Sequence, residues 1–123
     1  MYLYFVLNAS YPVALWRVEF YQKQAGLAPV RAFLDGLEGK HKREALSLIA
    51  LVGERGNTLR PPHSKLVETG LFELRGHQVR IFYIFRPGRR IVLLDGIIKN
   101  QDEIPGDVRD RVRAYRRDAE GQP

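Results

Sequence analysis

The chain has 123 residues and a net charge of +6 at neutral pH, with 45% hydrophobic and 28% charged residues, which is typical of one globular domain rather than a disordered chain. It contains no cysteine, which excludes a disulfide scaffold, a thiolate nucleophile and a thiolate zinc site. The three histidines lack the spacing of metal ligands, so we expect no metal and no other cofactor. Because arginine suits phosphate, the basic excess favours nucleic acid as a partner over an acidic protein or an anionic membrane, with simple solubility as the alternative.

The first residues are apolar, but Asn8, Ser10 and Pro12 interrupt them, which leaves a segment too short and broken for a membrane span. A signal peptide is disfavoured because no basic region precedes the apolar residues and the small-residue cleavage site is poor. The sequence therefore predicts an added arm or extra strand in residues 1–14 and a single domain in residues 15–123. We expect a cytoplasmic protein.

The first half of the domain predicts one strand and then two helices. Residues 15–22 are rich in aromatic and β-branched side chains, as strands are. Residues 28–38 carry apolar side chains at helical spacing, with Pro29 in the first turn. Residues 40–55 repeat that spacing and are followed by Gly56, a common helix stop. The prolines in residues 57–67 predict a loop without regular pairing.

The second half predicts three strands and a final helix. The strands occupy residues 71–75, 79–86 and 90–98, and short turns join them. Residues 106–118 form the helix, with Val108 and its neighbours one and two turns later facing inward. This order indicates an α+β fold, a small antiparallel sheet with helices packed on one side.

Two arginines face each other across the first hairpin of this sheet. Arg75 ends one strand and Arg80 is the second residue of the next, and like charges opposite each other repel. In a structural interpretation, Arg75 pairs with Glu73 or Glu68 and Arg80 extends off the sheet edge into water. In a functional interpretation, the two arginines hold a phosphate, and Lys99 joins them from the end of the next strand.

Further side chains have the same double interpretation. His77 and His63 are either exposed loop histidines or proton carriers beside a phosphate. Tyr83 is either a core residue or a platform on which a base stacks. The arginines on the outer face of the last helix are either solvated or follow a nucleic-acid backbone. The candidate RNA-contacting residues outside the hairpin are Lys65, Arg86, Arg113 and Arg116.

Several stretches together resemble a known family. The stretches KLVETGLFELR, VRIFYIF and RRIVLLDGIIKN, followed by the arginines of the last helix, are similar to the RelE/HigB-like toxins of type II toxin–antitoxin systems. The similarity is greatest to their phage-derived, HigB-like branch and extends from about residue 18 to residue 118. It implies a RelE-like (microbial ribonuclease-like) fold.

The resemblance also implies an activity. Such toxins are mRNA endoribonucleases that act on the ribosome without a metal, through attack of a ribose 2′-hydroxyl on the adjacent phosphate. Preorganised cations stabilise the added negative charge. Arg75, Arg80, Lys99 and Lys65 match the basic positions of the family, and Glu73 matches a motif position that orients Arg75. The implied partners are mRNA, the ribosome and a cognate antitoxin of the helix-turn-helix, HigA-like kind, with no membrane.

Two positions depart from the family pattern. Asp95 stands where the family has a histidine, and Asn100 stands where it has the second of two lysines. The candidates for proton transfer are therefore His77, His63 and Tyr83. The departures also leave two alternatives: a catalytically weak or inactive relative that binds RNA or antitoxin, and a protein whose basic surface only meets an acidic partner.

Overall fold

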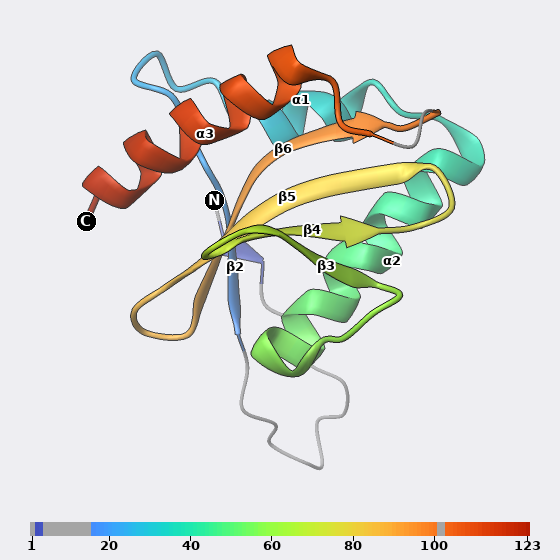
Figure 1. Ribbon diagram of the computed structural model, residues 1–123, viewed down its shortest axis with the longest axis horizontal. Coiled ribbons are helices and arrows are strands. Elements are labelled where there is room, and N and C mark those ends of the chain that lie inside the picture. The colour runs from blue at the N-terminus through green and yellow to red at the C-terminus, as the bar shows by residue number, and fades with distance from the viewer. Residues whose placement is uncertain (1, 4–15, 101–102) are drawn as a thin grey trace.

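The computed structural model describes residues 2–3, 16–100 and 103–123, and Figure 1 shows their arrangement. In these residues six strands form one sheet. They are β1 (Tyr2–Leu3), β2 (Arg17–Phe20), β3 (Ser64–Glu68), β4 (Leu71–Arg75), β5 (Val79–Arg86) and β6 (Arg90–Ile98). Their order across the sheet is β1-β2-β6-β5-β4-β3. The three last strands have the bounds that the alternation of side chains predicted.

The sheet is mixed rather than antiparallel. β2 runs parallel to β6, whereas the other neighbouring strands are antiparallel. A parallel pair needs a long crossover, and α1 (Pro29–Asp35) and α2 (Gly39–Arg55) lie in the connection that follows β2. The short helix η1 (Gly56–Thr58) ends this connection, and α3 (Gly106–Gly121) closes the chain. The expected α+β class is confirmed, and the arrangement is compatible with a RelE-like fold.

The helices cover both faces of the sheet. α1 and α2 pack on one side, as expected, and bury side chains such as Val30 and Ile49 against Ile81 of β5. α3 packs on the other face, where Val112 joins a second buried cluster with Phe82. Successive side chains of a strand point to opposite faces, so β5 contributes to both clusters. In Figure 1, α2 lies behind β3, β4 and β5.

Two other predictions need comment. β3 was missed because residues 57–67 were expected to be a loop, and the strand begins directly after Pro61, Pro62 and His63. Tyr2–Leu3 pairs with Val18 and Glu19 of β2, whereas the rest of the predicted arm or strand, residues 4–15, lies outside the described residues. No helix in the described part of the chain is long and apolar enough to cross a membrane.

One end of the sheet gathers several elements. The β4–β5 turn, the first residue of β3 and the last residues of β6 meet there. The beginning of α2 lies beside this turn, as Figure 1 shows. α3 begins shortly after β6 ends. This end therefore combines side chains from both halves of the chain.

Candidate functional site

The centre of the site is the directly opposed pair Arg75 and Arg80. The register of β4 and β5 places these two residues as Cα partners. Both side chains lie on the face of the sheet that α3 covers, because they alternate with Leu74 and Ile81, which point toward α2. Arg80 does not extend into water, since only 8% of it is exposed. Two positive charges are thus held together, one on a buried and one on a partly exposed side chain.

The turn itself holds the Arg80 guanidinium. Its Nη1 atom donates to the carbonyl oxygens of Gly76, at 2.8 Å, and Val79, at 3.0 Å. Burial lowers the pKa of Arg80, and the charge of Arg75 lowers it further, whereas Glu73 and Glu44 act in the opposite direction. The guanidinium is therefore oriented by neutral carbonyl groups, and no carboxylate neutralises it by direct contact among the described residues.

Arg75 has one acidic neighbour. Its Nε atom lies 3.3 Å from Glu73 Oε1, and Glu73 is 2% exposed. The structural interpretation of Arg75, an ion pair with Glu73, is thus confirmed. Among the described residues, however, Glu73 Oε2, Arg75 Nε and Arg80 Nε are buried without a hydrogen-bond partner. Such atoms are rare in folded proteins and require an explanation, and a bound anion would accept from both arginines.

The arginine pair borders a cavity of about 410 Å³. Its lining residues are Pro62, His63, Arg75, Gly76, His77 and Arg80. A second cavity of about 240 Å³ lies on the Glu73 side of Arg75. Its lining residues are Lys65, Glu73, Lys99, Glu103, Ile104 and Arg109. Because Glu73 and Arg75 are two residues apart on one face of β4, the two cavities are neighbours. We call them the arginine cavity and the lysine cavity.

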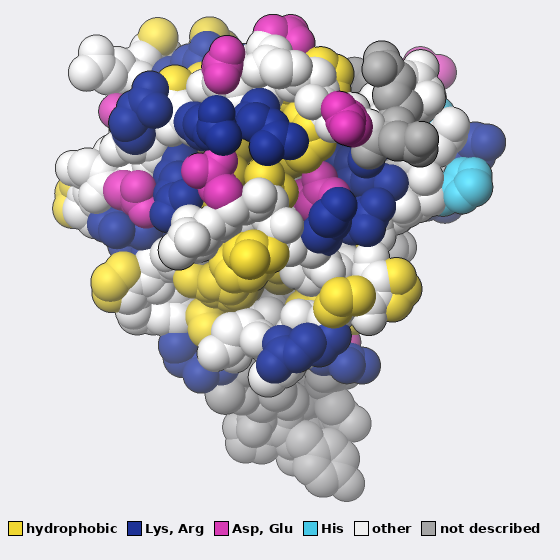
Figure 2. All heavy atoms as spheres, in the orientation of Figure 1, with side chains coloured by type: hydrophobic (Ala, Val, Ile, Leu, Met, Phe, Trp, Pro, Cys, Tyr) yellow, Lys and Arg dark blue, Asp and Glu magenta, His cyan; other side chains and the backbone are white. Residues whose placement is uncertain are grey.

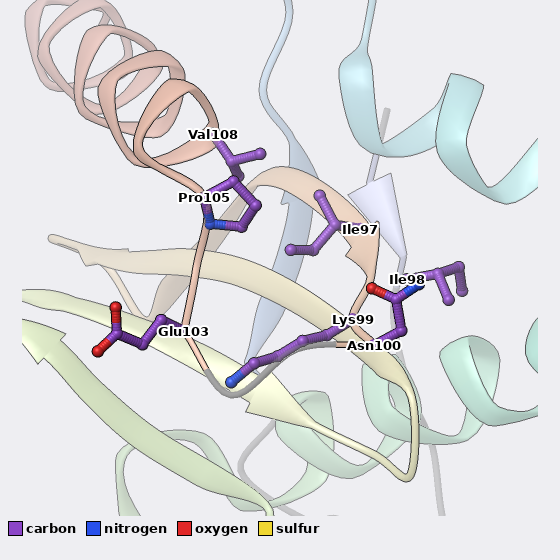
Figure 3. Close-up of a pocket in the computed structure, with 7 residues that line it drawn as sticks. All are labelled: Ile97, Ile98, Lys99, Asn100, Glu103, Pro105 and Val108. Carbon is purple, nitrogen blue, oxygen red and sulfur yellow. The ribbon is translucent and has the colours of Figure 1, made fainter.

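Lys99 links the lysine cavity to a smaller apolar pocket. This pocket, of about 130 Å³, lies between the end of β6 and the beginning of α3. Figure 3 shows the Lys99 amine extending away from Ile98 and toward the side on which Glu103 lies. Ile97, Pro105 and Val108 make the pocket apolar, so the positive charge of Lys99 stands at the border of an apolar and a basic region.

Basic side chains continue along α3. Figure 2 shows Lys and Arg side chains gathered over α3 and at the end of the sheet near the β4–β5 turn, with acidic side chains among them. Arg113 Nε donates to Glu68 at 2.8 Å, which lowers the pKa of that carboxyl. Arg116 Nε donates to Glu120 at 3.2 Å. These two candidate RNA contacts therefore already have acidic partners, whereas Arg109 lines the lysine cavity.

Two predicted site residues lie elsewhere. Arg86 is at the far end of β5, where its Nη2 atom donates to the Gln122 carbonyl at 3.2 Å. Tyr83 points into the α2-side cluster, is 1% exposed, and shares a 2.8 Å hydrogen bond with the Ser64 hydroxyl. Burial raises the pKa of Tyr83, and the Ser64 hydrogen bond offsets this only in part. Tyr83 therefore offers no ring to a base and no proton to this site.

The remaining candidates are brought together. His77 and His63 are exposed and both line the arginine cavity. Lys65 is the Cα partner of Glu73 across β3 and β4, and it lines the lysine cavity. The structure thus brings basic, acidic and imidazole groups together at one end of the sheet, and their roles stay predictions.

Two contacts at or near the site were not predicted from the sequence. Glu44 of α2 accepts the backbone N–H groups of Gln78 and Val79, both at 2.8 Å. Asp95 accepts from Arg111 Nε at 2.7 Å and so ties β6 to α3. Neither contact has a local signal, because each joins residues at least 16 positions apart. A single acid in the basic first half of α2 was the only hint of Glu44.

The comparison with protein families concerns nearly the whole of this site. The model of the family described as phage-derived protein Gp49-like (DUF891) matches residues 32–117, well over half of the chain. The chain belongs to the Gp49-like family. This family is phage-derived and toxin-like, and is associated with the toxins of toxin–antitoxin systems, which implies an antitoxin partner in general. No curated protein matches the chain.

Proposed function

We propose that the protein is the toxin of a type II toxin–antitoxin system of the RelE/HigB kind, and that it cleaves mRNA on the ribosome. The observation that carries this proposal is the opposed Arg75–Arg80 pair, in which Arg80 is buried and the Nε atom of each side chain lacks a hydrogen-bond partner among the described residues. A phosphate between the two arginines offsets their repulsion and accepts from both Nε atoms. Membership of a toxin-like family supports the same conclusion.

The main requirement of the proposed reaction is positive charge that stabilises the transition state, and not a covalent intermediate with the protein. The ribose 2′-oxygen attacks the adjacent phosphorus, the bond to the 5′-oxygen breaks, and the products are a 2′,3′-cyclic phosphate and a 5′-hydroxyl end. Negative charge grows on the phosphoryl oxygens in between, and preorganised donors stabilise it most. Arg75 and Arg80 supply these donors, and Lys65 and Lys99 of the lysine cavity hold the neighbouring phosphates.

One proton must leave the 2′-hydroxyl and another must reach the 5′-oxygen. Glu73 and His77 line the two neighbouring cavities beside Arg75, and we assign them to the two sides of the phosphate that an in-line displacement requires. Glu73 Oε2 is buried without a partner and accepts the first proton. His77, or His63, which also lines the arginine cavity, gives the second.

A second function follows from Asp95. Its two oxygens accept from Arg111 and from the Gly96 N–H, at 2.7 and 2.9 Å, so it is committed to structure. The position at which the resembling toxins have a histidine therefore provides no proton carrier in this chain. If the remaining groups do not transfer protons fast enough, the protein binds RNA or its antitoxin without cleaving RNA.

The test is induced expression with and without the neighbouring gene, combined with mapping of transcript 5′ ends. We expect growth arrest, new 5′ ends inside translated regions, and relief by the neighbour. The double variant Arg75→Ala with Arg80→Ala should lose cleavage. The matched control, Arg55→Ala with Arg117→Ala, removes the same charge from exposed positions away from the cavities and should stay active.

Three results would contradict the proposal or change it. Normal growth with intact transcripts favours the binding protein. Salt-sensitive RNA binding without cleaved product favours it further. Equal activity of the double variant and its control would show that the arginine cavity is not the site of cleavage.

A further inference from the structure

A single carboxylate oxygen of α2 accepts two backbone N–H groups of the β4–β5 turn. Glu44 Oε1 accepts the N–H groups of Gln78 and Val79, and both distances are 2.8 Å. We propose that Glu44 is a positioning residue, which fixes the turn so that Arg80 and Lys99 are held ready for an RNA phosphate. The inference rests on the proposed function for its substrate, but the contacts on which it depends do not.

The turn that Glu44 holds carries the acceptors for both basic residues. The carbonyl oxygens of Gly76 and Val79 accept from Arg80 Nη1. The carbonyl oxygen of Gln78 accepts the backbone N–H of Lys99 at 2.7 Å. Three carbonyl groups of one short turn therefore set the places of the Arg80 guanidinium and of the Lys99 backbone. A displacement of the turn would move both cations together.

The packing of Gly76 shows that the turn is shaped around Glu44. A Cβ atom at this position would collide with the carboxylate and the Cγ atom of Glu44. Gly76 also closes the turn, because its N–H donates to the Val79 carbonyl at 3.0 Å. A glycine here thus permits the close approach of Glu44, and any larger residue would displace its side chain. From the same helix, His41 Nε2 lies 2.7 Å from Gln78 Oε1 and forms a second contact with the turn.

A carboxylate suits this position for two reasons. One oxygen can accept two N–H groups that would otherwise be partly buried without partners. The negative charge also favours the charged form of Arg80, which its burial and the charge of Arg75 disfavour. Glutamine keeps the first property and lacks the second, whereas alanine lacks both. The two substitutions therefore separate the geometric role of Glu44 from its electrostatic role.

The experiment compares Glu44→Ala and Glu44→Gln with a matched control, Glu54→Ala, which removes the same charge from the same helix. The readouts are single-turnover cleavage of ribosome-bound mRNA and the NMR signal of the Arg80 Nε–H group. The signal is followed with and without an oligonucleotide whose 2′-deoxy sugar prevents cleavage. We expect Glu44→Ala to lower the cleavage rate about 10- to 100-fold with little change in RNA affinity, because misplacement affects the transition state most.

Glu44→Gln should restore the rate to within about threefold of wild type if geometry dominates, and the control should behave as wild type. A second variant, Gly76→Ala, should shift the Arg80 signal as Glu44→Ala does, whereas Gly106→Ala, a position with open space, should not. An unchanged rate and an unchanged Arg80 signal in Glu44→Ala would overturn the inference. So would equal loss of activity in the alanine and glutamine variants with an unmoved Arg80 signal.

Failure of the proposed function gives a different result. If the wild-type protein does not cleave RNA, the kinetic readout is lost for every variant. The Arg80 signal and its response to the uncleavable oligonucleotide still report whether Glu44 positions the cation. A wild-type response that Glu44→Ala abolishes and Glu44→Gln retains supports the positioning role in a protein that only binds.

Discussion

The sheet carries a directly opposed arginine pair at each end of β5, and the two pairs have different surroundings. At one end, Arg75 and Arg80 are Cα partners, and at the other end Arg86 and Arg90 are. Arg90 forms a bidentate contact with Glu19, with N–O distances of 2.7 and 2.9 Å. Among the described residues, the first pair has an ion pair with Glu73 alone, whose 3.3 Å approach to Arg75 lacks hydrogen-bond geometry.

The difference teaches that opposed arginines are not by themselves a site. At the second end, the fork of Arg90 meets a carboxylate, which neutralises its charge and satisfies its donors at once, although the Nε atom of Arg86 is buried without a hydrogen-bond partner among the described residues. Backbone carbonyls near the C-terminus accept from Arg86 and Arg90 there as well. At the first end the cations are oriented, but their charge remains largely available. A protein accepts such a local conflict where a ligand resolves it.

The largest expected effect is a difference in cleavage rate between variants of the two arginine pairs. Arg80→Ala should lower the rate of mRNA cleavage about 100- to 1000-fold, because it removes a preorganised donor from the developing negative charge. Arg86→Ala, about 20 Å away along the same strand, should change the rate by less than about threefold. Cleavage assays on translating ribosomes measure both. Similar losses for the two variants would mean that RNA depends on general positive charge and not on the arginine cavity.

The next effect is a difference in unfolding free energy between variants of the two arginine pairs. Arg90→Met should lower the free energy of unfolding by about 2 kcal/mol, since it leaves the mostly buried Glu19 carboxylate without its bidentate partner. Arg80→Met should leave the free energy unchanged or raise it by up to about 1 kcal/mol, because it removes a buried charge that Arg75 repels. Urea denaturation of both variants gives these values. A stability loss in Arg80→Met as large as in Arg90→Met would show that Arg80 is structural.

The sequence predicted the elements best where their patterns were local. The bounds of β4, β5 and β6 follow from alternation and from short turns, and the structure confirms them. β3 was missed because Pro61 and Pro62 indicate a loop, although regular pairing begins only two residues later. The coverage of the second face by α3 was implied by β5, whose two faces are both apolar, but the order of the elements alone favoured one layer of helices.

The residues of the candidate site were likewise predictable only where the pattern that reveals them is local. The opposed arginines and the alternation that places Glu73 beside them were visible as a hairpin pattern. The contacts of Glu44 and Asp95 were not, because they bring α2 and α3 to residues far away in the chain. Arg86 has the residue type and strand of the site but belongs to the other end, which only the length of β5 reveals.

A smaller effect is expected for Tyr83, which lies on the face of the sheet that α2 covers. Tyr83→Phe should lower the free energy of unfolding by about 1 kcal/mol, because the Ser64 hydroxyl loses a buried partner. The cleavage rate should not change, since Tyr83 lies in the cluster on the α2 side. Thermal denaturation and the cleavage assay test this together. A loss of activity without a loss of stability would return Tyr83 to the group of proton carriers.

The smallest effect is the pH dependence of the first end. Burial opposes the charged form of Glu44, but the N–H groups of Val79 and Gln78, together with His77 and His41, lower its pKa below the ordinary value of 4.5. A carboxyl whose pKa is lower in the folded state adds stability above its ordinary pKa, and this stability is lost as the pH falls through the lower, folded value. Below pH 4.5 the β4–β5 turn should therefore loosen before the sheet unfolds.

Amide hydrogen exchange, followed from pH 6 to pH 3 and corrected for intrinsic rates, compares the two ends of β5 directly. Gln78 and Val79 should lose protection in acid, and Glu44→Gln, which cannot ionise, should remove this pH dependence. The β5–β6 turn serves as the internal reference, because the hydrogen bonds that Glu44 accepts in the described part of the chain come from the β4–β5 turn. If both turns lose protection together, acid acts on the whole fold, and the carboxylate does not hold the arginine end separately.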